Sequence, residues 1–574
     1  MLALPFGRIG ATLGSAHMMP IERKAFRALF ILLLMLSFAV AGLSQCRFPS
    51  SRVGRTITFS FVPENTASGT ILHVTVQFEG NSRGFEQIEI PVEWAGEKLH
   101  AVSNLRALSS STTIDDSGSG EKTIRYRPDF SVVLAYDLSK DWAGPLVHPY
   151  QFHPVVMPDY FEINGDNALV VPKLPRGALI TANFDFHALP SGWSLATSFG
   201  ASNDRGEYCQ TSSGERDEVL FHALLAAGDF RIQRFRIGRR DAVLAVRGKW
   251  TFTDGQAVEE IRKIVGIVRD FWRDDHFPYF LVTLKPYDQD HGSGDGSAFT
   301  NAFWIYMSRL DPFETQLTQL AHESFHAWNP FRMGPYESYR AFDWFKEGFT
   351  QYYAYKLVYL AGMMPLSAYV ESLNRDLRLY PGSADPYIRG RGIALWLDGE
   401  IRRESKGKKS LNSVMLDMVH GVDKPLTLER ILQTAGRYLT PAARRQFEGA
   451  ANQGDVLLPA ADAALPGCAA LGVSMEELPV FDLGFDFAAS RLANRVIGVR
   501  EDGPAWRAGL RDGQKLTQLS VYNGQPDRLA TFTIDAGGQP QVIQYYPRGK
   551  SVTAPQYRLD LAELTARPGS CLSR

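Results

Sequence analysis

The sequence has 574 residues, which corresponds to roughly two to four domains of ordinary size. Hydrophobic residues make up 45% of the chain and charged residues 21%, a composition that excludes a disordered, collagen-like or coiled-coil protein. Lys and Arg total 61 against 62 Asp and Glu, so the net charge of -1 supplies no broad positive field, and nucleic acid is not expected as a partner.

The first 41 residues predict a secretory signal. Arg23, Lys24 and Arg27 precede an apolar run over 28–38, and residues 39–41 form a small-x-small cleavage site. The alternative is a membrane anchor, but the run is shorter than the roughly 18 to 20 apolar residues that span a bilayer. We therefore expect a secreted, periplasmic protein with no stable membrane anchor after cleavage.

Four cysteines (Cys46, Cys209, Cys468 and Cys571) are spaced too widely for a thiolate metal site. Disulfides persist in the compartment that a secretory signal implies. Of the three possible pairings, we favour Cys46 with Cys209 and Cys468 with Cys571, because each bridge then stays near one end of the chain. This pairing is a hypothesis from proximity in sequence.

The segment from about 55 to 190 is typical of β-structure. Residues 56–61, 71–76 and 88–92 alternate in polarity or are β-branched, and Gly, Asn, Ser and Pro separate them. Residues 109–120 are mostly small and polar, which predicts a mobile loop. We expect an N-terminal β-sandwich-like domain at 42–200.

The hydrophobic period becomes helical between about 215 and 460. An apolar stripe over 258–272 predicts a helix, and 279–284 and 302–307 read as buried strands on either side of a glycine-rich turn at 291–296. A further helix is predicted to begin at Asp311, because Asp311-Pro312-Phe313-Glu314 places an N-cap, a proline and a capping-box acid in order.

This helix carries the motif His322-Glu323-Ser324-Phe325-His326. Positions four apart share one face of a helix, so both imidazoles can converge on one ion with Glu323 beside them. Zinc suits two neutral imidazoles and one carboxylate, since a fourth position stays open for water.

The third ligand should be an acid on a neighbouring helix. Asp343 can cap a helix that runs to about residue 360, and Glu347 stands early in it. An isolated helical Glu is usually a solvated surface residue. Glu347 is instead flanked by Trp344, Phe345 and Phe349, where an unpaired carboxylate would be costly and a metal would satisfy it.

The residues at 322–329, 344–353 and 387–390 resemble the gluzincin metallopeptidases, and within them the glycyl aminopeptidase family. The resemblance implies a multidomain α+β fold, with a mainly helical thermolysin-like catalytic domain and its small sheet at 201–465. It implies one Zn2+ per chain, held by His322, His326 and Glu347, with Glu323 as the general base. It also implies a peptide or protein substrate.

Tyr387 is the candidate donor for the oxyanion that develops during peptide hydrolysis. In related aminopeptidases a tyrosine before a basic-glycine pair has this role, and Tyr387 precedes such a sequence. A core tyrosine is the structural alternative, and Tyr352 and Tyr353 are the other candidates if the fold differs.

One departure from the family concerns the loop that holds the amine of the substrate. The family has a glutamate there, whereas this sequence offers Asp295 within residues 292–299. An aspartate in a glycine-rich loop is commonly a turn former. Exopeptidase and endopeptidase activity therefore stay open at this point, as does the preferred side chain.

The last segment, 466–574, resembles a PDZ domain. A glycine loop at 483–487 is followed by a predicted strand at 496–499 and a short helix after Gly503-Pro504. The resemblance implies a groove for a peptide C-terminus. A non-catalytic, chaperone-like peptide-binding protein is the alternative to an enzyme, and the intact His322, Glu323, His326 and Glu347 argue against it.

Overall fold

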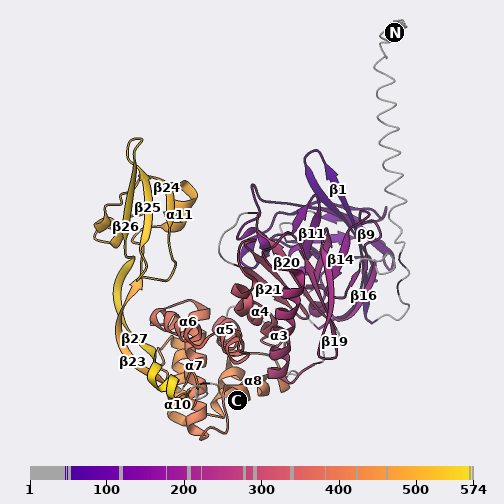
Figure 1. Ribbon diagram of the computed structural model, residues 1–574. Coiled ribbons are helices and arrows are strands. Elements are labelled where there is room, and N and C mark those ends of the chain that lie inside the picture. Colours follow the sequence, from indigo (N-terminus) through magenta and orange to yellow (C-terminus); the bar gives the residue numbers. More distant parts are fainter. Residues whose placement is uncertain are drawn as a thin grey trace, which may run out of the picture.

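The computed structural model describes Cys46, residue 48 and residue 571, together with the ranges 53–115, 120–175, 177–202, 208–221, 223–275, 279–288, 294–335, 342–381, 383–421, 424–460 and 463–567. The predicted secretory signal lies outside these residues. Within them, we find no helix whose length and apolar character would let it span a bilayer. The arrangement is multidomain α+β, with an N-terminal β-sheet region, a central helical region and small C-terminal sheets (Figure 1).

The N-terminal region contains three sheets that share one apolar core. The six-stranded sheet has the order β16 (Cys209–Glu215), β13 (Leu179–Asp185), β1 (Arg55–Thr66), β2 (Gly69–Glu79), β9 (Ser131–Ser139) and β6 (Val102–Ala107). The five-stranded sheet has the order β10 (Val155–Met157), β11 (Tyr160–Asn164), β17 (Leu224–Gly228), β14 (Ser194–Thr197) and β15 (Gly200–Ser202). The four-stranded sheet has the order β12 (Val171–Pro172), β3 (Phe85–Glu89), β8 (Glu121–Arg125) and β7 (Thr113–Asp115).

The strands predicted at 56–61 and 71–76 lie within β1 and β2, whereas the one predicted at 88–92 overlaps β3 only at residues 88 and 89. Ile57, Phe59 and Phe61 alternate along β1 and are fully buried, because successive side chains of a strand point to opposite faces. The third strand ends at Glu89, just before Pro91, which has no N–H to donate to a neighbour. The predicted loop at 109–120 contains the short strand β7.

The central region has a five-stranded sheet and a set of helices that cover it. The sheet order is β18 (Arg231–Ile237), β19 (Arg240–Val246), β20 (Tyr279–Pro286), β22 (Ala302–Met307) and β21 (Asp295–Phe299), with β21 antiparallel at the edge. The helices are α3 (Asp254–Trp272), α4 (Leu317–His326), α5 (Asp343–Leu360), α6 (Leu366–Leu379), α7 (Pro386–Glu404), α8 (Leu411–His420), α9 (Leu428–Gly436) and α10 (Pro441–Gln453). The apolar stripe of α3 packs into the same core as α4 and α5.

The predicted start of the motif helix was wrong. Pro312 has an extended backbone and occupies the N-cap position of a 3-10 turn, η4 (Phe313–Gln316), without a side-chain hydrogen bond to that turn. The helix α4 begins only at Leu317. Asp311 therefore lies outside the helix rather than capping it. The start of α5 is one residue off, because Phe342 occupies the N-cap and Asp343 is the first helical residue.

The C-terminal region is joined to the helices by a long two-stranded arm of β23 (Leu471–Phe481) and β27 (Arg548–Leu559) (Figure 1). Beyond the arm lie a small sheet and two short helices, β24 (Lys515–Ser520), β25 (Ala530–Asp535), β26 (Pro540–Tyr545), α11 (Phe487–Ala493) and α12 (Pro504–Ala508). The short helix after Gly503 is present. The strand predicted at 496–499 does not form, and 483–486 is a loop that leads into α11.

Two disulfides join Cys46 to Cys209 and Cys468 to Cys571, which confirms the proposed pairing. The second bridge closes the C-terminal region onto the central helices, where the hydroxyl of Tyr359 donates to the backbone oxygen of Cys571 at 2.9 Å. The arm also contacts α6, since Asn374 exchanges hydrogen bonds with the backbone of Tyr557 at 2.7 and 2.8 Å.

Candidate active site

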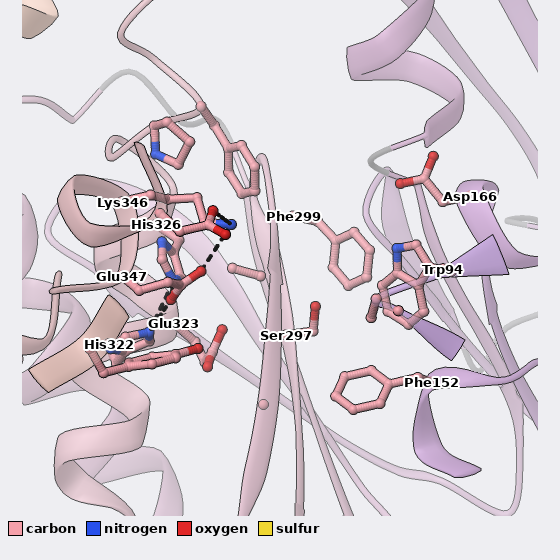
Figure 2. A pocket seen from close by; sticks show the side chains of 18 of the residues that line it. Trp94, Phe152, Asp166, Ser297, Phe299, His322, Glu323, His326, Lys346 and Glu347 are labelled. Atoms are coloured by element: carbon pink, nitrogen blue, oxygen red, sulfur yellow. Dashed lines mark hydrogen bonds and ion pairs between the residues drawn. The ribbon is translucent and has the colours of Figure 1, made fainter. Parts of the chain in front are cut away.

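A cleft of about 730 Å³ lies between the N-terminal sheets and the central helices (Figure 2). Its helical wall consists of residues from α4, α5 and the start of α7, namely His322, Glu323, His326, Glu347 and Tyr387. Its β wall comes from the N-terminal region, namely Glu93, Trp94, Phe152 and Asp166. The edge strand β21 lies between the two walls and turns Ser297 and Phe299 toward the β wall.

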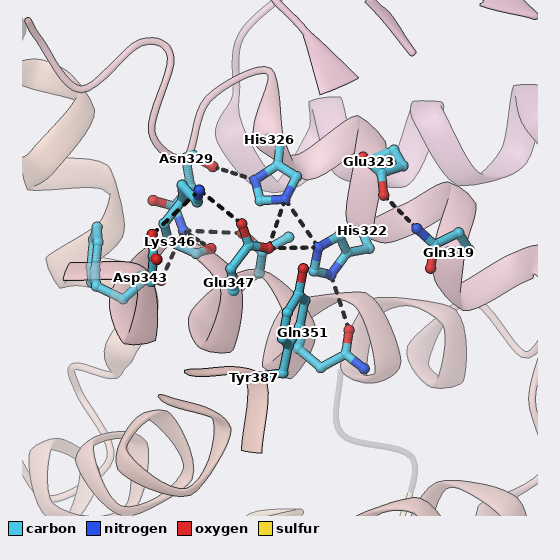
Figure 3. A network of polar contacts seen from close by, with 12 residues as sticks. Gln319, His322, Glu323, His326, Asn329, Asp343, Lys346, Glu347, Gln351 and Tyr387 are labelled. Carbon is cyan, nitrogen blue, oxygen red and sulfur yellow. Dashed lines mark hydrogen bonds and ion pairs between the residues drawn. The ribbon is translucent and has the colours of Figure 1, made fainter. Parts of the chain in front are cut away.

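The three predicted zinc ligands converge on the helical wall (Figure 3). The Nε2 atoms of His322 and His326 are 3.0 Å apart, and Glu347 Oε2 lies 3.2 Å from the first and 3.3 Å from the second. All three side chains are largely or fully buried. The four-residue spacing on α4 brings the imidazoles together, and α5 packs against α4 to supply the carboxylate.

The hydrogen bonds of the imidazoles fix how they face the centre of the cluster. His326 Nδ1 lies 2.8 Å from the backbone oxygen of Asn329, which can only accept, so Nδ1 carries the proton. His322 Nδ1 lies 3.0 Å from Gln351 Oε1. Both Nε2 lone pairs then face each other and a carboxylate oxygen, an arrangement of acceptors that a cation satisfies. Two imidazoles and one carboxylate fit zinc with an open fourth position.

Glu347 is held ionised by its surroundings. Burial alone would raise its pKa, but the imidazoles of His326 and His322 and the ammonium of Lys346 hold the pKa of Glu347 well below its ordinary value. Lys346 Nζ lies 2.9 Å from Glu347 Oε1 and 3.4 Å from Asp343 Oδ1. The residue is therefore present as the carboxylate that a metal site requires.

Glu323 lies on the face of α4 beside the ligands and is 4% exposed. Gln319 donates to its Oε1 from one turn earlier. Burial, with a smaller contribution from Glu347, raises the pKa of Glu323 to about 7, although His322 acts in the opposite direction. A Cβ at Gly296 on β21 would lie 2.6 Å from Glu323 Cγ, so only glycine lets the edge strand pass this close to the acid.

Tyr387 is the tyrosine that lines the cleft. Its ring stacks on His322 with 5.6 Å between centroids, and the side chain is 41% exposed to the cleft. Burial and the nearby carboxylates of Glu347 and Glu323 raise the pKa of Tyr387 above its ordinary value, so the hydroxyl keeps its proton and can donate it. Tyr352 and Tyr353 are buried elsewhere, bonded to Asp398 and Asn412.

Asp295 is at the start of β21, but its carboxylate already has partners. Tyr287 donates to Asp295 Oδ2 at 2.5 Å, Gln151 donates to it at 3.2 Å, and His148 Nδ1 lies 3.1 Å away. Asp295 is absent from the residues that line the cleft. The contacts of Oδ2 thus join β21 to the N-terminal region.

Sequence reasoning missed two groups of residues. The first is Asn329, fully buried, whose amide donates to Thr350 Oγ1 at 3.1 Å and to the backbone of α5, so that it ties the segment after α4 to the helix that carries Glu347. The second is the β wall. No motif marks Trp94, Phe152 or Asp166, which come from three separate segments of the N-terminal region.

Comparisons with known proteins agree with this geometry. The model of the M61 glycyl aminopeptidase family matches residues 315–390, which include the whole helical wall. No curated protein matches the chain. An aminopeptidase N family protein from Idiomarina loihiensis has a similar structure, with a TM-score of 0.66 and 16% identity over 88% of this chain and 99% of that chain. An M1 zinc metallopeptidase from Deinococcus radiodurans gives a TM-score of 0.47 and 14% identity over 71% of this chain and 95% of that chain.

The likeness to the Idiomarina protein shows that the fold extends over most of the chain. The family match falls on the segment where His322, His326 and Glu347 meet, which confirms the resemblance noted in the sequence. Residues 315–390 therefore match the M61 glycyl aminopeptidase family and bring together the His322, His326 and Glu347 cluster of a zinc metallopeptidase.

Proposed function

We propose that the protein is a secreted, periplasmic aminopeptidase that hydrolyses peptides at their N-terminal end. The observation that carries this proposal is the convergence of three metal ligands, a buried carboxyl group and a tyrosine hydroxyl on one wall of a single cleft. The match to glycyl aminopeptidases supports the exopeptidase class. The basic and apolar segments at 23–38 support secretion.

Each residue of the helical wall has a separate role in the proposed reaction. His322, His326 and Glu347 would hold zinc, which when bound acts as a Lewis acid and lowers the pKa of coordinated water toward about 7. Glu323 takes the proton of the attacking water and passes it to the leaving amine, a task suited to a pKa of about 7. Tyr387 donates its hydroxyl proton in a hydrogen bond to the substrate oxygen as negative charge develops.

An endopeptidase of the same fold is the second candidate. The observation that favours it is the position of Asp295, whose Oδ2 accepts from Tyr287 and Gln151 and which does not line the cleft. Asp295 is the one acid of residues 294–299, so this loop presents no carboxylate to a terminal amine in the cleft. Matched peptides with free and N-acetylated termini separate the two candidates, because an aminopeptidase rejects the acetylated peptide and an endopeptidase cleaves both.

The hydrolytic proposal is tested by zinc content together with one substitution. The purified protein should contain one zinc per chain and cleave peptides, and Glu323→Gln should keep the zinc while losing turnover. Glu371→Gln, at an exposed glutamate on α6, is the matched control and should keep both zinc and turnover. Full activity in Glu323→Gln would exclude the proposed base, and a metal-bound protein without turnover would favour the chaperone-like alternative.

The C-terminal region is proposed to present a PDZ-like groove to a peptide C-terminus. Its own small core, which includes Leu483, Phe485 and Phe532, supports an independently packed unit. A peptide with a free C-terminal carboxylate should bind, and its C-terminal amide should not. Cell fractionation of the expressed full chain tests the periplasmic location.

A further inference from the structure

The β wall of the cleft contains an acid, Asp166, that forms no ion pair with any residue the structure describes. Asp166 is the second residue of α2 (Gly165–Ala168), a short helix whose first turn is fixed by a reciprocal capping box between Asn164 and Asn167. Figure 2 shows the Asp166 carboxyl group beside Trp94, across the cleft from the ligand cluster. The backbone that carries Asp166 is thus held in place, and its side chain borders the space a substrate enters.

The charges around Asp166 leave it uncompensated. Among the described residues, no Lys, Arg or His forms an ion pair with its carboxylate. The charge of Arg216 lowers the pKa of Asp166, but this guanidinium is itself paired with Glu89 and donates to the backbone oxygen of Leu174 at 2.8 Å. Burial first, and then the negative charge of Asp217, raise the pKa of Asp166 to about 7.

The helical wall shows the opposite condition. Its cation, Lys346, is already paired with Glu347 at 2.9 Å and lies 3.4 Å from Asp343. The cleft therefore has a paired cation next to the ligands. On the far side lies Asp166, whose carboxyl group is hydrogen-bonded to Trp94 and forms no ion pair with a described residue, and Glu93 adds a second, exposed carboxylate there. A substrate that fills the cleft and places a cation at the β wall would therefore bind more tightly than a neutral substrate.

Aromatic rings surround this position. The indole of Trp94 stacks on Phe299 of β21 with 6.4 Å between centroids and an interplanar angle of 15°, and it meets Phe152 edge-on at 5.7 Å. Phe152 in turn packs on Trp304 at 5.6 Å. Such rings accept the aliphatic stem of a cationic group and attract its charge through their faces.

We infer that Asp166 and Trp94 form a subsite for a substrate ammonium or guanidinium group, so that Asp166 determines specificity for a cation at the β wall. The inference rests on the proposed peptidase function and extends it by naming the chemistry of the substrate. The cation can come from the free N-terminus or from a Lys or Arg side chain. If the cation is the free N-terminus, Asp166 would hold the terminal amine in place of Asp295, which does not line the cleft.

The test measures binding rather than turnover. The zinc-loaded Glu323→Gln protein is titrated by calorimetry at pH 8 with three kinds of peptide of equal length. One is N-acetylated and neutral, one is neutral with a free N-terminus, and one is an N-acetylated series in which a single Lys replaces norleucine at successive positions. One cationic kind should bind about 10- to 100-fold tighter than the neutral peptide, as expected for a charge-assisted hydrogen bond.

Each further substitution is made in the Glu323→Gln protein. Asp166→Asn should abolish the preference for the cationic peptide, Asp166→Glu should retain part of it, and Glu97→Gln should leave it intact. Glu97 is the control, since it is an acid on the hairpin that carries Trp94, formed by β4 (Glu93–Trp94) and β5 (Glu97–Lys98), but it does not line the cleft. Unchanged zinc content and thermal midpoint show that each variant is folded.

The responding peptide identifies the source of the cation, because the free N-terminus and the Lys series are measured separately. Equal binding of neutral and cationic peptides, or a preference that survives Asp166→Asn, overturns the inference. Failure of the proposed function has a different signature, namely no hydrolysis of any peptide by the wild-type protein, and it leaves this binding comparison intact.

Discussion

The two walls of the active-site cleft are built in opposite ways. The helical wall comes from residues 322–387 of the chain, and its imidazole ligands are oriented by the hydrogen bonds that they donate to oxygens of Asn329 and Gln351. The β wall comes from three segments between residues 93 and 166, and aromatic packing positions it. The comparison indicates that one local segment supplies the chemistry, while the tertiary contact between regions supplies the space that selects a substrate.

The sharpest test of this division removes a ligand. Glu347→Ala should reduce zinc content from one per chain to background and bring peptide hydrolysis to background with it, because two imidazoles alone leave the site one donor short. Metal analysis and initial rates at several zinc concentrations check this. Glu371→Ala, an exposed glutamate on α6, is the control. Stoichiometric zinc and normal rates in Glu347→Ala would contradict the ligand assignment.

The next effect concerns Tyr387. Tyr387→Phe should lower kcat by about 100- to 1000-fold with a small change in KM, because the lost donor acts when the oxyanion forms. Steady-state kinetics on one peptide give both constants. Tyr355→Phe, on α5 outside the cleft, should keep wild-type rates. A change in KM alone would place Tyr387 among the binding residues, and the helical wall would then share the role assigned to the β wall.

A smaller effect is expected on stability, from the buried acid that joins the two helices α5 and α7 of the helical wall. Asp398 of α7 is fully buried and accepts from Lys356 Nζ at 2.7 Å and from Tyr352 at 2.8 Å, both on α5. Burial would raise its pKa, but Lys356 and Arg402 lower the pKa of Asp398 to about 2 from the ordinary 3.8. Since the folded pKa is depressed, the stabilisation is complete above about pH 4 and is lost as the pH falls toward 2.

The free energy of unfolding should therefore drop by about 2 kcal/mol over that range through this one group. Urea denaturation at pH 2 to 5 measures it for the wild-type protein and for Asp398→Asn. The variant should be less stable at pH 5 and should show a flatter dependence on pH. Parallel curves for the two proteins would remove Asp398 from the account of how α5 and α7 are held.

The smallest effect is expected on the β wall. Trp94→Ala should raise KM by about 3- to 30-fold and leave kcat nearly unchanged, since the indole contacts substrate away from the reacting bond. Trp506→Ala, on α12 of the C-terminal region, is the control. A fall in kcat with constant KM would break the comparison, because the β wall would then act on the transition state.

Local signals predicted much of the helical wall. The spacing of His322 and His326, and the apolar residues that surround Glu347, depend only on helix geometry and burial, so the sequence predicted the ligands and the two helices that carry them. The start of α4 was missed because Asp311-Pro312 has the composition of a helix cap but adopts an extended conformation before a 3-10 turn.

The rest depends on contacts between distant segments. From the sequence, Asp295 was either an amine-binding acid or a turn former, and its partners Tyr287, Gln151 and His148 became visible only once β21 was placed against the N-terminal region. Asp166 carries no motif, since its importance comes from which cleft it borders. The expected strand at 496–499 does not form, because the backbone pairing of this segment with residues 513–515 stops after Arg495, which bridges to Lys515, and Val496, which exchanges hydrogen bonds with Gln514 and Gly513.

The arm of β23 and β27 holds the rest of the C-terminal region as an insertion whose two ends are adjacent. Phe481 and Arg548 are paired at the end of the arm, where the chain enters and leaves the inserted segment. The ends of the excursion are already adjacent, so a tight turn joining them would delete everything between while the arm, its contacts with α6 and the Cys468–Cys571 bridge stay in place. The same junction would accept a foreign domain, which makes it a grafting point in an otherwise continuous protein.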